Sequence, residues 1–280
     1  MFENPRLVTL FRNDSTCAAV AFSDQSAHLL PYADVGELIR TGLPLDEKVS
    51  NATRSGERVT FSLNELAPLI TTPGKIICLG LNYSEHVAEM GHDAGTYPTL
   101  FAKFGDTLTG PFADIDLPVI SNATDYEVEL AIVIGAKARN VSPGDAHRTI
   151  AGFCVANDVS MRDYQRRSSQ FLQGKIFEAT TPLGPALVPP AEVGFGSDLV
   201  IESWVNGEMR QSSSTSNLIF GIDEIICYIS EIVSLMPGDV ILTGTPSGVG
   251  AGMRPPIFLT QGDLVACSIE GVGNISNLFI

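Results

Sequence analysis

Three acidic residues in two short stretches of the 280-residue chain have the type and spacing of ligands for a divalent metal ion. Glu127 and Glu129 alternate with apolar residues, so a β-strand would direct both carboxylates to one face. Asp158 closely follows the apolar run 151–156, where a buried strand would emerge into a loop. Three carboxylates that lie together repel one another unless they take up protons or bind a dication. Because every donor is an oxygen atom, we expect Mg²⁺, Mn²⁺ or Ca²⁺ rather than Zn²⁺.

The alternative for Glu127 and Glu129 is a half-exposed strand whose acids are solvated. A Glu-x-Glu pattern alone favours that alternative, because acidic side chains are seldom fully buried. Asp158 shifts the balance toward a metal site, since a second stretch then supplies an acid at a strand end. The four histidines and five cysteines show no spacing typical of zinc sites.

A candidate acid–base pair precedes these acids in the chain. His86 and Glu89 lie three residues apart, which places them on one face of a helix, where the carboxylate can orient the imidazole. A surface helix with solvated polar groups has the same spacing, and spacing by itself favours it. Gly91 and Gly95 flank the segment and would permit it to move as a lid. The histidines without comparable support are His28, His92 and His147.

Lys175 is the candidate for stabilising negative charge that develops in a substrate. It follows Gly174 and precedes the apolar residues Ile176 and Phe177, as expected of a partly desolvated ammonium beside an oxyanion. A lone lysine is more often a solvated surface group. The sequence therefore assigns Lys175 to the site only together with the acids.

The densest basic cluster of the chain lies at residues 162–167. Arg162 and Arg166 share a face at helical spacing, and they could bind a substrate carboxylate. Charge balance with Asp163 and Glu178 explains the cluster equally well.

The glycine-rich segment Thr243–Gly250 invites comparison with a phosphate-binding loop. It lacks the Gly-Lys-Ser/Thr ending and runs into Arg254-Pro255-Pro256 rather than into a helix, which disfavours nucleotide binding. A tight loop that brings its backbone and the Thr245 hydroxyl toward a substrate fits the segment better.

The composition limits the partners of this site. A formal net charge of −15 disfavours binding to nucleic acid and to anionic membranes, although a dication and clustered arginines can still attract a small anion locally. The five cysteines are far apart among apolar neighbours and are expected to be reduced core residues. No stretch approaches the length of a membrane span, and the N-terminus lacks the pattern of a signal peptide, so we expect a cytoplasmic protein.

Strand-like runs dominate the chain from residue 75 onward, and they have to position these side chains. Asn206-Gly207 is the clearest hairpin signal, because both residues accept the positive φ of a type I′ turn. An amphipathic helix follows Asp223 and ends at Pro237-Gly238. Without regular βαβ alternation, a β-rich α+β fold is predicted. The predicted strands are 76–80, 128–134, 151–156, 199–205, 240–243 and 264–269, and the apolar helix face is Ile225, Ile226, Ile229, Ile232 and Val233.

The first part of the chain predicts a smaller unit. Apolar runs at residues 7–11 and 17–22 flank a turn-forming segment and indicate a hairpin. Residues 34–40 indicate a short helix that stops near Gly42 and is followed by a polar stretch. We therefore predict a small N-terminal β domain at residues 1–72 and a catalytic domain at residues 73–280.

The order of several motifs resembles the fumarylacetoacetate hydrolase family over roughly residues 75–280. Any one motif could arise by chance, but the ordered set is specific. The motifs are Gly-Leu-Asn-Tyr-Ser-Glu-His-Val-Ala-Glu at 80–89, Asp-Tyr-Glu-Val-Glu-Leu at 125–130, Asn-Asp-Val-Ser at 157–160 with Arg162, Asp163 and Gln165, Gly-Lys at 174–175, Pro-Leu-Gly-Pro at 182–185, and Thr-Gly-Thr-Pro-Ser-Gly-Val-Gly at 243–250.

This resemblance implies a mixed β-sheet roll as the catalytic domain, a homodimer, and Mg²⁺ or Mn²⁺ as the working ion. Phe104 departs from the family pattern, since members often carry a proline there, and the shape of the pocket near Lys103 is therefore open. By motif position, the implied metal ligands are Glu127, Glu129 and Asp158, the implied catalytic pair is His86 and Glu89, and the implied substrate contacts are Lys175, Gln165 and Thr245.

The expected reaction is hydrolysis of a carbon–carbon bond in an acylpyruvate-type diketo acid, for example fumarylpyruvate from aromatic catabolism. The metal ion would act as a Lewis acid on the 2-oxo acid, and His86 would activate a water molecule. Lys175 and Gln165 would stabilise the oxyanion. The family also contains decarboxylases of oxaloacetate-like acids, isomerases and hydratases, so these reactions are the alternative. A binding protein without catalysis is a further alternative, disfavoured because each motif residue is present.

Overall fold

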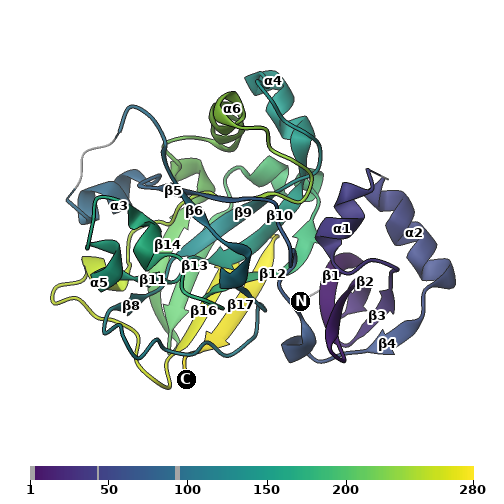
Figure 1. The fold of residues 1–280 in the computed structure, drawn as a ribbon, viewed down its shortest axis with the longest axis horizontal. Coiled ribbons are helices and arrows are strands. Elements are labelled where there is room, and N and C mark those ends of the chain that lie inside the picture. The colour runs from purple at the N-terminus through teal and green to yellow at the C-terminus, as the bar shows by residue number, and fades with distance from the viewer. Residues whose placement is uncertain (1–3, 43, 92–94) are drawn as a thin grey trace.

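A computed structural model of the chain describes residues 4–42, 44–91 and 95–280, and it is built on a long mixed sheet (Figure 1). Most neighbouring strands in this sheet are antiparallel, whereas β15 pairs with β5, and β7 with β12, in parallel. In spatial order the strands are β4 (Arg58–Thr60), β3 (Ser26–Leu29), β2 (Ser15–Ser23), β1 (Arg6–Arg12), β12 (Thr181–Val188), β10 (Ile150–Asn157), β9 (Val128–Ile134), β15 (Val240–Leu242), β5 (Ile76–Gly80) and β6 (Thr99–Lys103), with β7 (Leu108–Thr109) beside β12.

A second, four-stranded sheet packs against the long sheet and forms the main core between them. Its strands contact β9, β10 and β12 of the long sheet. A short strand pair, β8 (Thr124–Asp125) with β11 (Ser160–Met161), lies next to the ends of β9 and β10. In spatial order the second sheet consists of β14 (Glu208–Ser214), β13 (Val200–Val205), β16 (Leu264–Ile269) and β17 (Gly273–Leu278).

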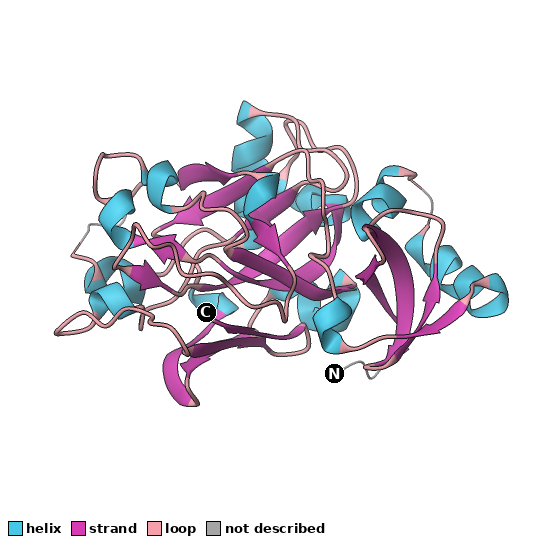
Figure 2. Ribbon diagram, turned by 60° about the horizontal axis from the view of Figure 1, so that its bottom comes forward, coloured by secondary structure: helices cyan, strands magenta, loops and turns pink. Residues whose placement is uncertain are grey.

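The helices lie around the strands, which occupy the middle of the molecule (Figure 2). Helices α1 and α2 cover β1–β3 at one end, and α4 packs against α6 (Figure 1). None of the helices among the described residues is long and apolar enough to cross a membrane. The α-helices are α1 (Val35–Arg40), α2 (Leu45–Ser55), α3 (Ser84–Glu89), α4 (Pro143–Ala146), α5 (Arg162–Gln165) and α6 (Ile222–Ile232).

The alternation predicted for strand β9 is confirmed. The even-numbered residues from Val128 to Ile134 pack into the core between the two sheets, whereas Ala131 and Val133 pack on the opposite face against β5 and β12. Glu127 and Glu129 share the face of Ala131. Because both faces of β9 are buried, the interpretation of these glutamates as solvated acids is wrong.

Most of the predicted elements are present, and the misses have local causes. The two predicted hairpins occur, with positive φ at Asn206 and Gly207 in the second. Helix α2 and strand β4 lie in the stretch that the sequence left without an element, because α2 contains few apolar residues; of its described side chains, Leu45 and Val49 pack on the core. The apolar face predicted for α6 extends two residues too far, because Ile232 is 60% exposed and Val233 already has extended backbone.

The N-terminal strands continue the sheet of the larger part of the chain. Leu7 of β1 pairs with Leu187 of β12, which joins β1–β4 to β10 and β9. Residues of β1, β2 and β3 also enclose a small core of their own with Phe61 and Leu66. The predicted domain boundary at residue 72 stays a prediction. Hydrogen bonds between β1 and β12 connect the two predicted domains.

Buried Asp34 also joins the two sides. It caps the predicted helix α1, where its Oδ1 accepts a hydrogen bond from the backbone N–H of Glu37 at 2.5 Å. Its Oδ2 accepts from the backbone N–H and the hydroxyl of Thr71 at 2.7 and 2.6 Å. One carboxylate therefore fixes both the start of α1 and the segment that leads into β5.

We expect Asp34→Asn to lower the free energy of unfolding by about 2 kcal/mol, because an amide N–H₂ would face N–H donors in a buried place. Chemical denaturation of the variant and the wild type measures the difference. Asp116→Asn, at an exposed position, is the control and should change stability little. Equal stability of Asp34→Asn and the wild type would show that the carboxylate does not hold the two segments together.

Candidate active site

The three predicted acids come together inside the long sheet. Glu127 directly precedes β9, Glu129 lies on it, and Asp158 directly follows the neighbouring strand β10. The backbone N–H of Asp158 donates to the carbonyl of Glu127 at 2.8 Å, which sets the two chain segments side by side. One carboxylate oxygen from each acid lies within 4.8 Å of the others, and all three side chains are buried.

The arrangement fits a divalent ion with oxygen ligands. Two oxygens bound to one ion lie at most about 4.2 Å apart at the Mg²⁺ distance, and at most about 5.2 Å apart at the Ca²⁺ distance. A separation of no more than 4.8 Å therefore needs at most a small side-chain adjustment. Glu127, Glu129 and Asp158 are the residues that would hold the ion, as the sequence predicts.

Buried cations contact two of these acids directly. Lys175 Nζ lies 2.5 Å from Glu127 Oε2 and 2.7 Å from Asp158 Oδ2. Arg162 Nη2 lies 2.7 Å from Glu127 Oε1, and Lys103 Nζ lies 2.6 Å from Asp158 Oδ1. No role was predicted for Lys103. Its position at the end of the apolar run 100–102 is the signal that could have identified it as a buried lysine.

These neighbours give the two glutamates opposite ionisation behaviour. Burial raises the pKa of Glu127, but the charges of Lys175 and Arg162 outweigh burial and lower that pKa to about 2. Burial and the charges of Asp158 and Glu127 raise the pKa of Glu129 well above the ordinary value. Without a bound cation, Glu129 is therefore the acid that tends to keep its proton.

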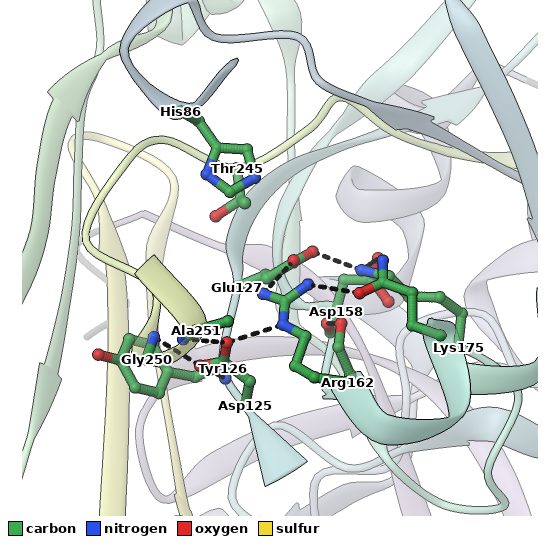
Figure 3. A network of polar contacts seen from close by, with 12 residues as sticks. His86, Asp125, Tyr126, Glu127, Asp158, Arg162, Lys175, Thr245, Gly250 and Ala251 are labelled. Atoms are coloured by element: carbon green, nitrogen blue, oxygen red, sulfur yellow. Dashed lines mark hydrogen bonds and ion pairs between the residues drawn. The ribbon is translucent and has the colours of Figure 1, made fainter. Parts of the chain in front are cut away.

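A fourth buried acid, Asp125, connects this site to the glycine-rich loop after β15. Its Oδ2 accepts from Arg162 Nε at 2.8 Å and from the backbone N–H of Ala251 at 3.0 Å (Figure 3). Its Oδ1 accepts from the backbone N–H of Gly250 at 2.7 Å. Since Arg162 also contacts Glu127, the loop and a predicted metal ligand are joined through two side chains. The sequence placed Asp125 in a motif but assigned it no role.

Gly174 allows Lys175 to reach the acids. A Cβ atom at Gly174 would lie 2.6 Å from the carbonyl oxygen of Met161 and from the backbone nitrogen of Gln165, so the backbones could not approach this closely. Lys175 is 2% exposed, and its ammonium also lies 5.2 Å from the centre of the Phe101 ring. The predicted desolvation of this lysine is confirmed.

The His86 and Glu89 pair occurs on helix α3 as predicted. His86 Nδ1 lies 3.2 Å from Glu89 Oε2. A carboxylate at Nδ1 favours the tautomer with its proton on that nitrogen, and this leaves Nε2 as the basic atom. His86 is 6% exposed and lines the same cavity as Glu127 and Glu129, so the interpretation as a solvated surface pair is wrong.

The glycine-rich loop holds Glu89 from the other side. The backbone N–H of Gly248 donates to Glu89 Oε1 at 3.0 Å. A Cβ atom at Gly252 would lie within 2.5 Å of three Glu89 side-chain atoms, so the loop can approach the carboxylate only with glycine there. The orientation of His86 thus depends on a loop that lies far away in the sequence.

The Thr245 hydroxyl is largely used inside the protein. It donates to the carbonyl of Val128 at 2.9 Å and accepts from Gln211 Nε2 at 2.7 Å. A hydroxyl has one proton, so Thr245 could only accept a further hydrogen bond from a ligand. The contact of Thr245 with the substrate stays a prediction. It could involve a hydrogen-bond donor of the substrate and the Thr245 hydroxyl, or the Thr245 methyl group.

A cavity of about 330 Å³ connects these side chains and is at the small end of the range for ligand sites. Glu127, Glu129 and His86 lie on its wall. Phe104 is 51% exposed and does not line the cavity, so this departure from the family pattern does not reach the cavity wall. An apolar part of the wall consists of Leu79, Leu81, Met90, Phe101 and Phe171.

Arg162 and Gln165 also line the cavity, but their contacts narrow their predicted roles. Arg162 is buried and paired with Asp125 and Glu127, so charge balance explains it, although with acids other than the two expected. Gln165 Oε1 accepts from Arg162 Nη1 at 3.0 Å, which leaves the N–H₂ group of Gln165 as the part that can meet a ligand. Both roles in substrate binding stay predictions.

Comparison with known proteins identifies relatives of the chain. Residues 75–280 match the family described as fumarylacetoacetate (FAA) hydrolase C-terminal. The chain is 46% identical over 221 residues to oxaloacetate tautomerase FAHD2B, mitochondrial, of Bos taurus, a match that covers 78% of this chain and 69% of the relative. It is 45% identical over 221 residues, with the same coverage, to oxaloacetate tautomerase FAHD2A, mitochondrial, of Homo sapiens.

Two solved structures share the fold over almost the whole chain. Fumarylacetoacetate hydrolase from Exiguobacterium antarcticum superposes with a TM-score of 0.84 at 31% identity and 99% coverage of both chains. Maleylpyruvate hydrolase from Sphingobium sp. SYK-6, in complex with manganese(II) and pyruvate, superposes with a TM-score of 0.80 at 26% identity and 98% coverage of both chains. The predicted fold, including the N-terminal β region, is confirmed.

We expect Glu129→Gln to weaken Mn²⁺ binding at least about 100-fold, because the substitution removes a charged ligand without changing its shape. Isothermal titration calorimetry of the purified protein measures the dissociation constant. Asp163→Asn, which changes an exposed acid near the site, should bind Mn²⁺ like the wild type. Unchanged affinity in both Glu129→Gln and Asp158→Asn would exclude this metal site.

Proposed function

Because the chain belongs to the fumarylacetoacetate hydrolase family, we propose for it a metal-dependent reaction on a small 2-oxo acid. The reaction is the interconversion of the keto and enol forms of a 2-oxo dicarboxylate such as oxaloacetate. The observation that carries this proposal is one oriented base, His86, in the same small cavity as Glu127 and Glu129, two of the three acids that would hold the ion. Tautomerisation requires a proton shift between a carbon and an oxygen, and a single base can perform it.

Glu127, Glu129 and Asp158 would hold the ion, which when bound acts as a Lewis acid that polarises the oxygens of a 2-oxo acid. Lys175 keeps its proton, because the charges of Asp158 and Glu127 raise its pKa despite the opposing effect of burial. Its ammonium therefore serves as a fixed positive charge beside the reacting oxygens. The N–H₂ group of Gln165 serves there as a hydrogen-bond donor.

His86 performs the proton shift in this proposal. Its Nε2 takes a proton from the carbon next to the 2-oxo group, and a proton is returned to the 2-oxygen, so that one C–H bond is replaced by one O–H bond. Glu89 stabilises the imidazolium between these two transfers. In Figure 3, His86 lies apart from the charged network around Glu127, which leaves the base outside the ion pairs. The apolar wall at Phe101 and Phe171 limits the access of water.

The named relatives support a tautomerase more than the hydrolase that the sequence predicted. The two oxaloacetate tautomerases share 45–46% identity with this chain. Hydrolysis of an acylpyruvate-type acid is the second candidate, and the observation that favours it is the maleylpyruvate hydrolase with pyruvate and manganese, at 26% identity. A role in aromatic catabolism, which was expected for a hydrolase and for an isomerase or hydratase of an unsaturated 2-oxo dicarboxylate, stays a prediction.

The assembly and the compartment stay predictions. The homodimer rests on the family resemblance alone. The five cysteines are free, and four of them are buried, as expected in a reducing compartment. A cytoplasmic location was expected because the sequence shows no signal-peptide pattern and no membrane span, whereas the named tautomerases are mitochondrial proteins.

We expect His86→Ala to lower kcat/KM for oxaloacetate tautomerisation about 10²- to 10⁴-fold, the usual contribution of a general base. The decay of the ultraviolet absorbance of the enol, in the presence of Mn²⁺, measures the rate. His147→Gln is the control, because His147 lies outside the cavity. Mn²⁺ binding by His86→Ala should remain, which separates loss of the base from loss of the site.

The same assay decides between the two candidates. Acceleration of enol decay by the wild type supports tautomerisation, whereas release of pyruvate from acylpyruvates without any effect on enol decay would replace it by hydrolysis. Activity of His86→Ala equal to that of the wild type would remove His86 from the mechanism in either case.

We expect Gly252→Ala to lower kcat more than about tenfold with little change in KM or in Mn²⁺ affinity. The new methyl group would displace Glu89 from its contacts with Gly248 and His86. Steady-state kinetics and calorimetry together measure these quantities. Gly144→Ala, in helix α4 outside the cavity wall and with no atom within 4 Å of its Cβ position, controls for a general effect of a methyl group. Wild-type kcat in Gly252→Ala would mean that the loop does not position Glu89.

A further inference from the structure

One side of the cavity is polar and comes from a single stretch of chain. The residues that line the cavity there are Gln165, at the end of helix α5, and Arg166, Ser168 and Ser169, which follow the helix. We refer to residues 165–169 as the polar rim. The backbone N–H of Arg166 donates to the carbonyl of Arg162 at 3.1 Å, so the rim starts from a backbone that is fixed next to the metal site. The backbone of Gln165, where the rim begins, also packs closely against Gly174.

The cations on the cavity wall differ in what they already contact. Lys175 forms ion pairs with Glu127 and Asp158. Arg162 forms ion pairs with Glu127 and Asp125. Arg166 also lines the cavity, its side chain is exposed, and none of the acids in the described parts of the chain forms an ion pair with it. Arg166 is therefore the guanidinium on the wall that can meet an anion without first breaking an internal ion pair.

The rest of the wall offers no alternative place for a second negative charge. The apolar part would leave a carboxylate without hydrogen bonds, which is unfavourable. The part near Glu127 and Glu129 is acidic and is compensated only by cations that are already paired. A carboxylate that extends away from the metal site is therefore most stable at the polar rim, where a planar guanidinium can bind both of its oxygens.

We infer that Arg166 binds the carboxylate of the substrate that lies distal to the 2-oxo group, and thereby selects dicarboxylic over monocarboxylic 2-oxo acids. This inference rests on the proposed function for the identity of the substrate. The sequence suggested that Arg162 binds a substrate carboxylate, and the inference assigns this contact to Arg166, one helical turn later in the chain. Arg162 instead maintains the ionised state of Glu127 and the position of Asp125.

The neighbouring arginine provides a matched control. The guanidinium of Arg167 lies 3.4 Å from the centre of the Tyr164 ring, and Arg167 does not line the cavity. Both arginines carry the same charge and both are exposed. An effect of overall charge on an anionic substrate would therefore be similar for the two, whereas a direct contact would involve only Arg166.

We expect Arg166→Gln to raise KM for oxaloacetate about tenfold, the usual effect of losing a hydrogen bond between charged groups, with kcat nearly unchanged. The ketonisation of enol-phenylpyruvate, a monocarboxylic substrate, should stay within about twofold of the wild type. Arg167→Gln should resemble the wild type with both substrates, and Arg166→Lys should restore part of the affinity for oxaloacetate. Equal losses for both substrates, or equal effects of Arg166→Gln and Arg167→Gln, would overturn the inference.

A binding experiment judges Arg166 independently of turnover. Calorimetry of the Mn²⁺-loaded protein compares 2-oxoglutarate with 2-oxopentanoate, which share a five-carbon chain and differ by the terminal carboxylate. The wild type should bind 2-oxoglutarate more tightly, and Arg166→Gln should remove most of this preference. If the wild type shows the preference but does not accelerate enol decay, the proposed function fails and the inference stands. Absence of the preference in the wild type, or its persistence in Arg166→Gln, overturns the inference alone.

Discussion

Burial of several like charges within one sheet is the constraint on which this site depends. An ionised carboxylate cannot be buried alone, so partners must lie within hydrogen-bonding distance. The cations present number one fewer than the acids, and burial together with the charges of Asp158 and Glu127 raises the pKa of Glu129. A dication at this place would more than offset the missing positive charge and would favour the ionised form of Glu129, so the site suits a metal ion. The acids are Asp125, Glu127, Glu129 and Asp158, and the cations are Lys103, Lys175 and Arg162.

The same charge network links parts of the site that lie on different elements. Asp125 accepts hydrogen bonds both from Arg162 and from the glycine-rich loop. That loop in turn holds Glu89, which orients His86. The candidate metal ligands therefore lie on or directly next to buried strands, whereas the candidate base lies on a six-residue helix whose Glu89 is held by a loop.

The relatives of this chain carry different reaction names, a tautomerase at 46% identity and hydrolases at 31% and 26%. A metal ion that polarises a 2-oxo acid is compatible with each of these reactions. The outcome must then depend on the groups that surround the remainder of the substrate. In this chain those groups are one oriented histidine, an apolar wall and the polar rim, and the proposals of a proton shift and of a doubly charged substrate rest on them.

The sequence by itself determined several of the strands, among them β5, β9 and β10, together with the shared face of Glu127 and Glu129, the spacing of His86 and Glu89, and the family, because these properties depend on local periodicity and on ordered motifs. The contacts of Lys103 and Asp125 were decided by tertiary structure, since they join segments that are far apart in the chain. The same holds for the exchange of roles between Arg162 and Arg166. Spacing places both arginines on one helical face, and both line the cavity, but only the fold decides which of them is neutralised by buried acids.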